Sequence, residues 1–358
     1  MLVLSNEEVG QLLTMEDCLD ALERLYIDYA NDKALLSLRH DNLSPNSTPE
    51  AYYAFKHMGG TWPAEGIQAL RLNSDVITHP VIEGKIRRVK QPLANGRWVG
   101  LVMLFSTETG QLLAMFPDGV MQRIRVGAAN GTALKHLARE DVSKLALIGS
   151  GWQAGAQLMA AMAVRDFKNV RVYSTRKENR ENFVAEVKSL YPTADIEVAD
   201  TPEECVEAAD VIMSATSAMI PVLQSEWIKP GMHISCIKTY EMSPEVLDKC
   251  DVVFIHTQAQ GKHIDNTLPG TPNVFNESKH KEWVNDREKG ILQYPDIKKL
   301  VAGQEPGRDN PEQVTCFVNN IGMGLQFAAA GAVIYKRAME AGIGVQLEDD
   351  WFSEDVHP

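Results

Sequence analysis

Residues 145–157, LALIGSGWQAGAQ, place two glycines between an apolar run and a stretch that favours a helix. In the pattern Gly149-x-Gly151-x-x-Ala154, the first glycine allows a tight turn, the second lets a ligand approach the backbone, and the alanine lets the helix pack closely on the strand. The N–H groups at the start of the helix can then bind phosphate oxygens. The spacing predicts a pyrophosphate site of a dinucleotide, the alternative being a glycine turn in an unrelated α/β domain. The residues between these positions are further candidate cofactor contacts: Ser150, Trp152 and Gln153.

The end of the next strand-like run, VRVYSTRK, indicates which dinucleotide is bound. An NAD(H) site usually has Asp or Glu here, whose carboxylate accepts hydrogen bonds from the ribose 2′-hydroxyl. This sequence has Ser174, Thr175 and Arg176 instead, and its first carboxylate is Glu178. Hydroxyl and guanidinium donors suit a 2′-phosphate, so NADP(H) is predicted over NAD(H), unless Arg176 only faces solvent. Two more candidate cofactor contacts end the strand-like run VIMSAT: Ala215 and Thr216.

These residues must be positioned by a domain in which strands and helices alternate. From about 140 to 260, strand-like runs (LALIG, VRVYS, IEVA, VIMSAT, HISCI, VVFIH) alternate with helix-like runs. The alternation predicts a parallel sheet covered on both faces, which is a Rossmann-type doubly wound α/β fold. The N-terminal part differs, because two capping boxes precede a predicted helix over about 15–31, and short β-rich runs follow between 40 and 120.

The composition limits the classes of function. The chain has 358 residues, a formal net charge of −13 and five scattered cysteines. Such an acidic chain argues against nucleic-acid binding. It has no apolar run of about 18 residues and no basic segment at its N-terminus, so neither a membrane span nor a signal peptide is expected. No Cys/His spacing typical of a metal site occurs, and the cysteines are expected to be reduced thiols of a cytoplasmic protein.

Three segments, in the same order, resemble the ornithine cyclodeaminase/μ-crystallin family. The loop LALIGSGWQAGAQ resembles its GxGxQA nucleotide loop, VGLVMLFSTETGQLLAMFPDGVMQRIRVGAANGTALKHLA resembles its RTAA-type helix with the preceding strands, and LVAGQEPGRDNPEQVTCFVNNIGMGLQ resembles its closing segment. The resemblance implies a Rossmann domain (128–319) inserted in an α+β substrate-binding and dimerisation domain (1–127 and 320–358). It also implies a homodimer and hydride transfer between a nicotinamide cofactor and the α-carbon of a small amino or imino acid.

The implied chemistry needs cations for the substrate carboxylate and an acid for the imine nitrogen. Arg125 occupies the position of the arginine in the RTAA-type helix, although Val126-Gly127 replaces the usual Thr-Ala. It is the first candidate for binding the carboxylate. Arg39 resembles, more loosely, an N-terminal arginine with the same role.

The family's active-site lysine has two alternative positions in this sequence. Lys56 in YYAFKHMGG resembles the FK of the cyclodeaminases, whereas GIQALRLNSD resembles the GxKxxxxxxxN strand of other members, with Gln68 at the lysine position. Arg71 follows three residues later, and in an extended strand it faces away from Gln68. Lys56 is therefore the first choice for binding the carboxylate or relaying the proton, and Arg71 is the second choice as a pocket cation.

The segment HISCIKTYEMSPEV departs most from the family pattern. Cyclodeaminases have HINxxG(G/S)D here and use its aspartate, whereas this chain has Lys238 and Glu241 nearby. Glu241 either supplies the catalytic carboxylate or opens the next helix. The missing aspartate argues against ornithine cyclisation and favours an NADP(H)-dependent imine (ketimine) reductase or amino-acid dehydrogenase. The alternatives are an ornithine cyclodeaminase that recycles NAD⁺ and a non-catalytic NADPH-binding protein.

Overall fold

The computed structural model describes residues 1–48, 50–82, 85–86, 88–218, 220–259, 264–272 and 290–356. The chain divides into two compact units. The first unit comprises Met1–Arg125, Gly261–Ser278 and Met323–Pro358, and the second comprises Val126–Gln260 and Lys279–Gly322. Within the described residues, no helix has the length and apolar character needed to cross a membrane.

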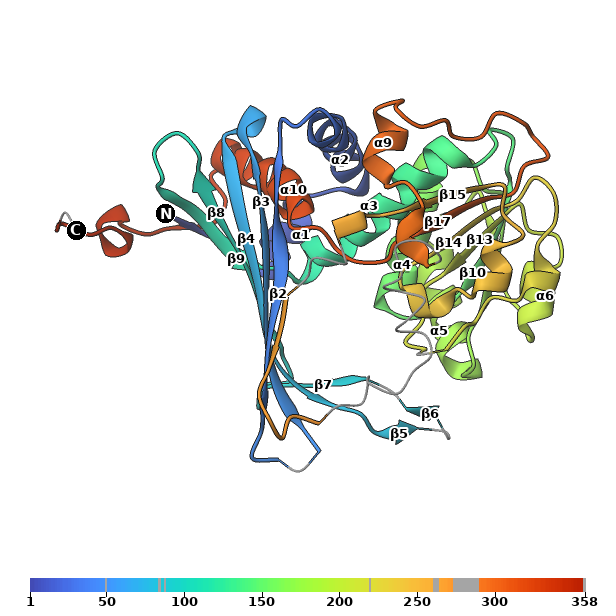
Figure 1. Ribbon diagram of the computed structural model, residues 1–358, viewed down its shortest axis with the longest axis horizontal. Helices are drawn as coiled ribbons and strands as arrows, with labels where there is room; N and C mark the ends of the chain where they lie inside the picture. The colour runs from blue at the N-terminus through green and yellow to red at the C-terminus, as the bar shows by residue number, and fades with distance from the viewer. Residues whose placement is uncertain are drawn as a thin grey trace. The chain divides into compact units, whose positions relative to one another are not determined.

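The second unit is built on a seven-stranded sheet in which all pairings are parallel (Figure 1). The order is β12-β11-β10-β13-β14-β17-β15, so the direction of winding reverses between β10 and β13. Ligands of doubly wound sheets bind at this reversal, outside the carboxyl ends of the strands. The predicted Rossmann-type α/β class is confirmed. The strands are β10 (Lys144–Ile148), β11 (Asn169–Tyr173), β12 (Asp195–Val198), β13 (Val211–Ser214), β14 (His233–Cys236), β15 (Val252–Ile255) and β17 (Thr315–Val318).

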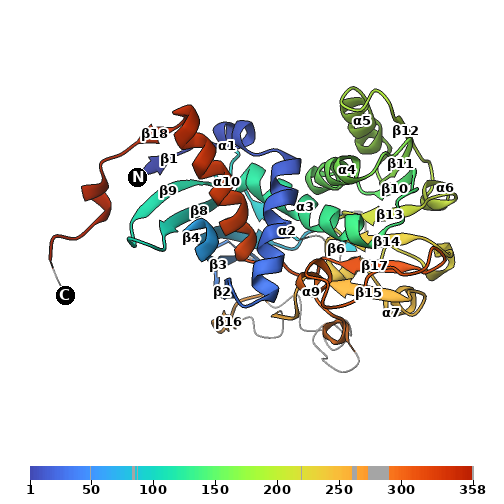
Figure 2. The ribbon, with the colours of Figure 1, turned by 90° about the horizontal axis from the view of Figure 1, so that it is seen from above.

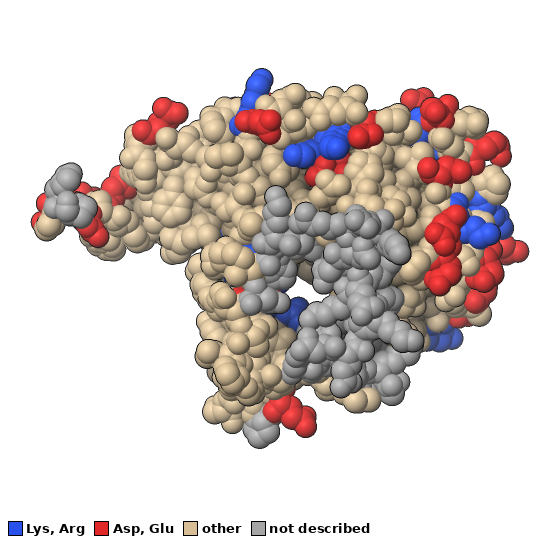
Figure 3. All heavy atoms as spheres, viewed as in Figure 1, with Lys and Arg blue, Asp and Glu red and all other residues tan. Residues whose placement is uncertain are grey.

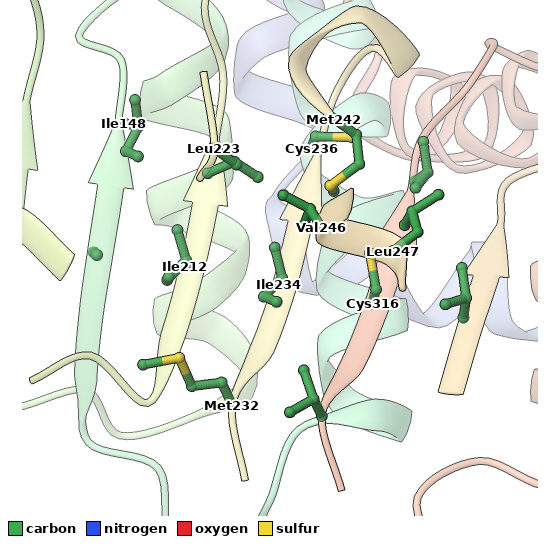
Figure 4. Packing of buried hydrophobic residues seen from close by; sticks show 14 of the residues in the cluster. Ile148, Ile212, Leu223, Met232, Ile234, Cys236, Met242, Val246, Leu247 and Cys316 are labelled. Carbon is green, nitrogen blue, oxygen red and sulfur yellow. The ribbon is translucent and has the colours of Figure 1, made fainter. Parts of the chain in front are cut away.

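Helices cover both faces of this sheet, because successive residues of each strand point to opposite sides. Leu145 and Leu147 of β10 pack in one apolar cluster with residues of α4 and α5, and Ala146 and Ile148 pack in another with residues of α6 and α7. Figure 4 shows the second cluster, in which Ile148, Ile212 and Ile234 of three neighbouring strands lie in one layer. The helices are α4 (Trp152–Val164), α5 (Lys177–Lys188), α6 (Pro202–Val206), α7 (Pro244–Leu247) and α9 (Ile297–Val301), with 3₁₀ turns at η2 (Ser225–Trp227), η3 (Thr239–Glu241) and η5 (Ile291–Gln293).

The first unit contains a nine-stranded mixed sheet with the order β16-β2-β3-β4-β8-β9-β1-β18, to which β7 adds by pairing with β4. Strands β2, β3, β4, β8 and β9 form a continuous antiparallel stretch. The strands are β1 (Leu2–Val3), β2 (Leu35–Pro45), β3 (Tyr52–Trp62), β4 (Ile67–Thr78), β7 (Val89–Gln91), β8 (Val99–Ser106), β9 (Leu112–Pro117), β16 (Ile264–Thr267) and β18 (Val345–Gln346). A separate hairpin pairs β5 (Val81–Ile82) with β6 (Lys85–Ile86).

Helices α1 (Asn6–Leu12), α2 (Met15–Ala30) and α10 (Leu325–Ala341) complete the first unit, with η1 (Pro63–Glu65) and η6 (Asp349–Phe352). The two predicted capping boxes begin α1 and α2, since Ser5 and Thr14 each accept from the N–H of the acid three residues later. Helix α10 packs against α2 and against β3, β4 and β8, and Figure 2 shows α2 and α10 side by side. Helix α3 (Gly119–Leu137) contains the division between the units.

Strand β16 lies in a stretch that the sequence analysis assigned to the Rossmann domain. Its residues Ile264–Thr267 pair in parallel with His40–Leu43 of β2, so they belong to the sheet of the first unit. Hydrogen bonds between segments more than 200 residues apart leave no local signal in the sequence.

In Figure 3, Asp and Glu side chains are spread over the visible face of the second unit with Lys and Arg between them, whereas the strands of the first unit are mostly uncharged on that side.

Candidate cofactor and substrate sites

The glycine loop of the second unit begins directly after β10. Gly149 has a φ of 128°, and a Cβ atom there would lie 2.3 Å from the carbonyl oxygen of Ala215. Only glycine is compatible with both conditions. The Gly149 N–H donates to the Tyr173 carbonyl (2.8 Å), and the Ala215 N–H donates to the Ile148 carbonyl (2.8 Å). The loop is therefore held between the ends of β11 and β13.

Gly151 is the N-cap of α4 and has an ordinary φ of −94°. A Cβ atom at Gly151 would meet no protein atom within 4 Å, so this glycine is not required by the packing of the chain. Ala154 is fully buried, as expected where the helix packs on the sheet, and the Trp152 side chain is 58% exposed at the same helix end. A tight turn, an unobstructed glycine backbone and a helix N-terminus fit the pyrophosphate of a dinucleotide.

Hydroxyl and cationic side chains gather at the end of β11. Ser150 Oγ in the glycine loop donates to Ser174 Oγ (2.8 Å), and Thr175 and Arg176 follow with exposed side chains. Arg180 of α5 supports this turn, because its Nη1 donates to the Ser174 carbonyl (2.9 Å) and its guanidinium lies over the Tyr173 ring. The structure thus brings together the predicted loop and strand-end residues, with no acidic residue at 174–177.

Glu241 lies in the second unit, in η3, and is fully buried. Its Oε1 accepts from the Thr216 N–H (2.5 Å) and its Oε2 from the Ile237 N–H (3.1 Å). Burial raises the pKa of Glu241, while Lys238 and these hydrogen bonds act in the opposite direction. The alternative that Glu241 opens the next helix is wrong, because the N-cap of α7 is Ser243. The carboxylate instead joins the loops that follow β13 and β14.

Three predicted cations of the first unit lie on its sheet, each near an acidic residue: Arg39, Lys56 and Arg71. Lys56 of β3 is paired in register with Asn73 of β4 and with Asp41 of β2, so all three side chains point to the same face. Gln68 points to the opposite face, where its side chain contacts Thr61. The structure places Lys56 and Arg71 on one face of the sheet and Gln68 on the other. The two alternative alignments therefore assign the family's lysine to opposite faces.

Arg71 is held by an acidic partner. Its Nε donates to Asp118 Oδ2 (2.7 Å), its Nη2 donates to Gln122 Oε1 (2.9 Å), and Asn73 also donates to Asp118 (3.2 Å). A Cβ atom at Gly100 would lie 2.2 Å from Asp118 Oδ1, so glycine is needed there for the carboxylate to reach the sheet. The Arg71 charge is compensated within the protein.

Lys56 is less well compensated. Among the described residues its Nζ has one acceptor, Asp75 Oδ2, at the long distance of 3.4 Å, and Asp75 Oδ1 is paired with Lys90 at 3.0 Å. Burial lowers the pKa of Lys56 to about 7, and the nearby Arg88 charge adds to the effect. Arg39, the remaining predicted cation on the sheet, makes a bidentate pair with Asp41 (2.7 and 2.6 Å).

Arg125 is the least compensated cation. It is 4% exposed, its Nη1 donates to Gln326 Oε1 (2.9 Å), and its Nε has no acceptor among the described residues. No carboxylate of the described residues lies within ion-pair distance of it. Burial, followed by Arg71, lowers its pKa to about 9, while the charge of Asp118, which is paired with Arg71, acts in the opposite direction. The Phe327 ring lies 5.0 Å from Arg125 Cζ and 5.6 Å from Arg71 Cζ. A buried guanidinium without an anion is suited to bind the carboxylate of a ligand.

Comparison with known proteins identifies the family. The model of the Ornithine cyclodeaminase/mu-crystallin family matches residues 1–342. The chain belongs to this family. Among the relatives of this chain, alanine dehydrogenase of Archaeoglobus fulgidus is 28% identical over 97% of this chain and 98% of its own length. Delta(1)-pyrroline-2-carboxylate reductase of Bacillus thuringiensis subsp. konkukian is 27% identical over 97% and 100%.

Solved structures of other proteins share this fold. Thermococcus litoralis Delta(1)-pyrroline-2-carboxylate reductase, in complex with NADH and L-proline, superposes with a TM-score of 0.76 at 24% identity and covers 97% of this chain and 100% of its own. An archaeal alanine dehydrogenase dimer with bound NAD has the same TM-score and identity and covers 97% of this chain and 99% of its own.

Sequence reasoning missed several polar partners in the first unit. Asp75 and Asn73 belong with Arg71 to a period-two stripe of β4, RLNSD, and a test for alternation in that strand would have found them. Asp118 and Lys90 come from other elements and left no such signal, because only strand pairing brings them to the stripe.

Proposed function

We propose that the chain is an NAD(P)H-dependent reductase of small 2-imino acids, which in reverse oxidises the corresponding amino acids. The observation that carries this proposal is the buried Arg125 guanidinium, whose only side-chain acceptor among the described residues is an uncharged amide. Burying such a charge costs several kcal/mol unless an anion compensates it. A substrate α-carboxylate supplies that anion. Two relatives are named alanine dehydrogenase and Delta(1)-pyrroline-2-carboxylate reductase, and these names support the same class of substrate.

The assigned roles follow from charge and protonation. Arg125 binds the α-carboxylate. Arg71, whose charge is already neutralised by Asp118, helps to orient the carboxylate but adds no net charge to the site. A bound nicotinamide cofactor supplies the hydride, and so both electrons, that reduce the C=N bond. Lys56 donates the proton that the nitrogen takes up and recovers one from solvent. A pKa near 7 suits a group that must both give and regain a proton near neutral pH.

We assign the glycine loop and the β11 end to the cofactor, with NADP(H) preferred over NAD(H). The exposed hydroxyl of Thr175 and guanidinium of Arg176 offer donors to a 2′-phosphate, and no carboxylate at 174–177 would repel it. Glu241 acts here as a positioning residue rather than as the substrate's acid. Both of its oxygens already accept backbone N–H groups, and one of these is the N–H of Thr216 in the cofactor loop.

The test is a steady-state assay of the purified protein. Five- and six-membered cyclic 2-imino acids, and pyruvate with ammonia, are mixed with NADPH or NADH, and cofactor oxidation and amino-acid formation are followed. Equal amounts of oxidised cofactor and product, with a higher kcat/KM for NADPH, are expected. Ornithine without added cofactor distinguishes the cyclodeaminase, since its conversion to proline and ammonia would refute the reductase. Tight NADPH binding without turnover of any imino acid would favour a binding protein instead.

We further propose that two copies of this chain associate through the open face of the large sheet in a reducing, cytoplasmic compartment. Half-buried apolar residues of β4, β8 and β9 adjoin one another there, with Leu72 opposite Leu101 and Leu70 opposite Met103. A patch of this kind usually marks an interface. The five cysteines are free thiols, four of them buried. Light scattering should show that the dimer is lost in Leu101→Glu. It should be kept in the control Leu190→Glu, because Leu190 is an exposed leucine of the second unit. A monomeric wild type, or a dimeric Leu101→Glu, would overturn this arrangement.

A further inference from the structure

Asp75 is shared between two lysines from different strands. It lies on β4 with a side chain that is 1% exposed, and its Oδ2 faces Lys56 Nζ at 3.4 Å while its Oδ1 faces Lys90 Nζ at 3.0 Å. Lys90 belongs to β7, which pairs with β4 so that Lys90 lies opposite Ile77. The Lys90 side chain is 37% exposed and the Lys56 side chain 7% exposed. The more solvated lysine therefore has the shorter contact with the carboxylate.

A single carboxylate cannot fully compensate two ammonium groups. The attraction between unit charges falls with distance, and each cation near Lys56 disfavours its charged form. The groups that face Lys56 leave a net positive surrounding, because Asp41 is already bound by Arg39 through two hydrogen bonds. The charges that act on Lys56 directly are those of Arg39, Asp41, Asp75 and Arg88. Lys90 acts through its contact with Asp75.

We propose that Asp75 is a positioning residue for Lys56 and that Lys90, by competing for the same carboxylate, sets the pH range in which Lys56 transfers its proton. This inference rests on the proposed function, in which Lys56 is the proton donor. It assigns a role to β7, which carries no residue that the sequence analysis singled out. The lowered pKa of Lys56 agrees with the geometry, since burial is opposed only by Asp75, at 3.4 Å, and by Asp41, which Arg39 already binds.

Two substitutions should move the pH profile in opposite directions. Lys90→Met removes a competing cation and leaves Asp75 to Lys56, which raises the pKa of Lys56. Asp75→Asn removes the negative charge with little change of shape, which lowers it. Because the protonated lysine is the active form in imine reduction, the high-pH limb of kcat/KM should move up by roughly one unit in Lys90→Met and down by roughly one unit in Asp75→Asn.

Lys336→Met is the matched control, because Lys336 is an exposed lysine of α10 in the same unit. Its profile should coincide with that of the wild type. The inference would be refuted if the high-pH limb of the kcat/KM profile stayed in place in Lys90→Met and Asp75→Asn, or moved in the same direction in both. If Asp75→Asn fails to fold, Lys90→Met alone decides, since the partly exposed Lys90 can be replaced without burying a charge.

A measurement without turnover separates this inference from the proposed function. Side-chain NMR of isotope-labelled lysine, with Lys56→Met to assign the signal, follows the titration of Lys56 directly in all variants. Opposite shifts in the NMR titration with an inactive wild type would uphold the shared carboxylate and refute the reductase. Reductase activity with no NMR shift in either variant would uphold the reductase and refute the inference.

Discussion

Replacing Arg125 with methionine should impair the reaction without weakening the fold. Burial lowers the pKa of this guanidinium from 12.5 to about 9. Each pKa unit corresponds to about 1.4 kcal/mol, so the charged form costs the folded state about 5 kcal/mol. At pH 7, below both values, Arg125 is protonated in the folded and the unfolded chain, and the whole cost is present.

Methionine removes this cost but also removes the hydrogen bond to Gln326 and the contact with the Phe327 ring. An unsatisfied buried amide costs about 1 to 3 kcal/mol. The free energy of unfolding of Arg125→Met should therefore equal that of the wild type or exceed it by a few kcal/mol. Two charge-assisted hydrogen bonds to a substrate carboxylate, at about 1.5 to 2 kcal/mol each, correspond to a loss in kcat/KM of roughly 10² to 10³-fold.

The assay combines urea unfolding of the ligand-free protein with imine-reduction kinetics, and Arg71→Met is the matched control. Arg71 is paired with Asp118, so its removal leaves a buried carboxylate without its cation and should cost about 3 to 5 kcal/mol of stability. A product amino acid should raise the midpoint of the wild type and leave that of Arg125→Met unchanged. If Arg125→Met lost stability as Arg71→Met does, or kept wild-type kcat/KM, the assignment of Arg125 to the substrate carboxylate would be refuted.

Four further substitutions test the remaining parts of the site. Gly149→Ala should lower the free energy of unfolding by about 2 to 4 kcal/mol. Gly151→Ala should remain as stable as the wild type, yet bind NADPH at least tenfold more weakly. Thermal unfolding and cofactor titration compare the two variants, and equal stabilities would contradict the assigned roles of the two glycines. Arg176→Glu should raise the KM for NADPH at least tenfold and leave that for NADH nearly unchanged, and equal effects on both cofactors would remove the 2′-phosphate contact. Gly100→Ala should displace Asp118 and lower stability by about 1 to 3 kcal/mol in urea unfolding, and a neutral effect would show that the carboxylate can move aside.

The Rossmann unit was predictable because its signals are local. Alternating strand-like and helix-like runs, a glycine pair at the end of a strand and a small residue where helix meets strand are all contained in short stretches of sequence. In the first unit, the two capping boxes and the helix that follows them were predictable, and the rest only as sheet-rich. No local pattern in the sequence indicates the order in which its strands pair in the sheet. Strand β16, for example, pairs with β2 across more than 200 residues.

The candidate site shows the same division between local and distant information. The order of residues along the chain determined the nucleotide loop, the hydroxyl and guanidinium groups at the end of β11 and the presence of Lys56, Arg71 and Arg125. Tertiary structure decided how each cation is compensated: Arg71 by Asp118, Lys56 by a carboxylate shared with Lys90, and Arg125 by no carboxylate among the described residues. The reason is that proton affinity depends on burial and on charges a few ångströms away in space, and strand pairing, not sequence distance, determines which charges those are.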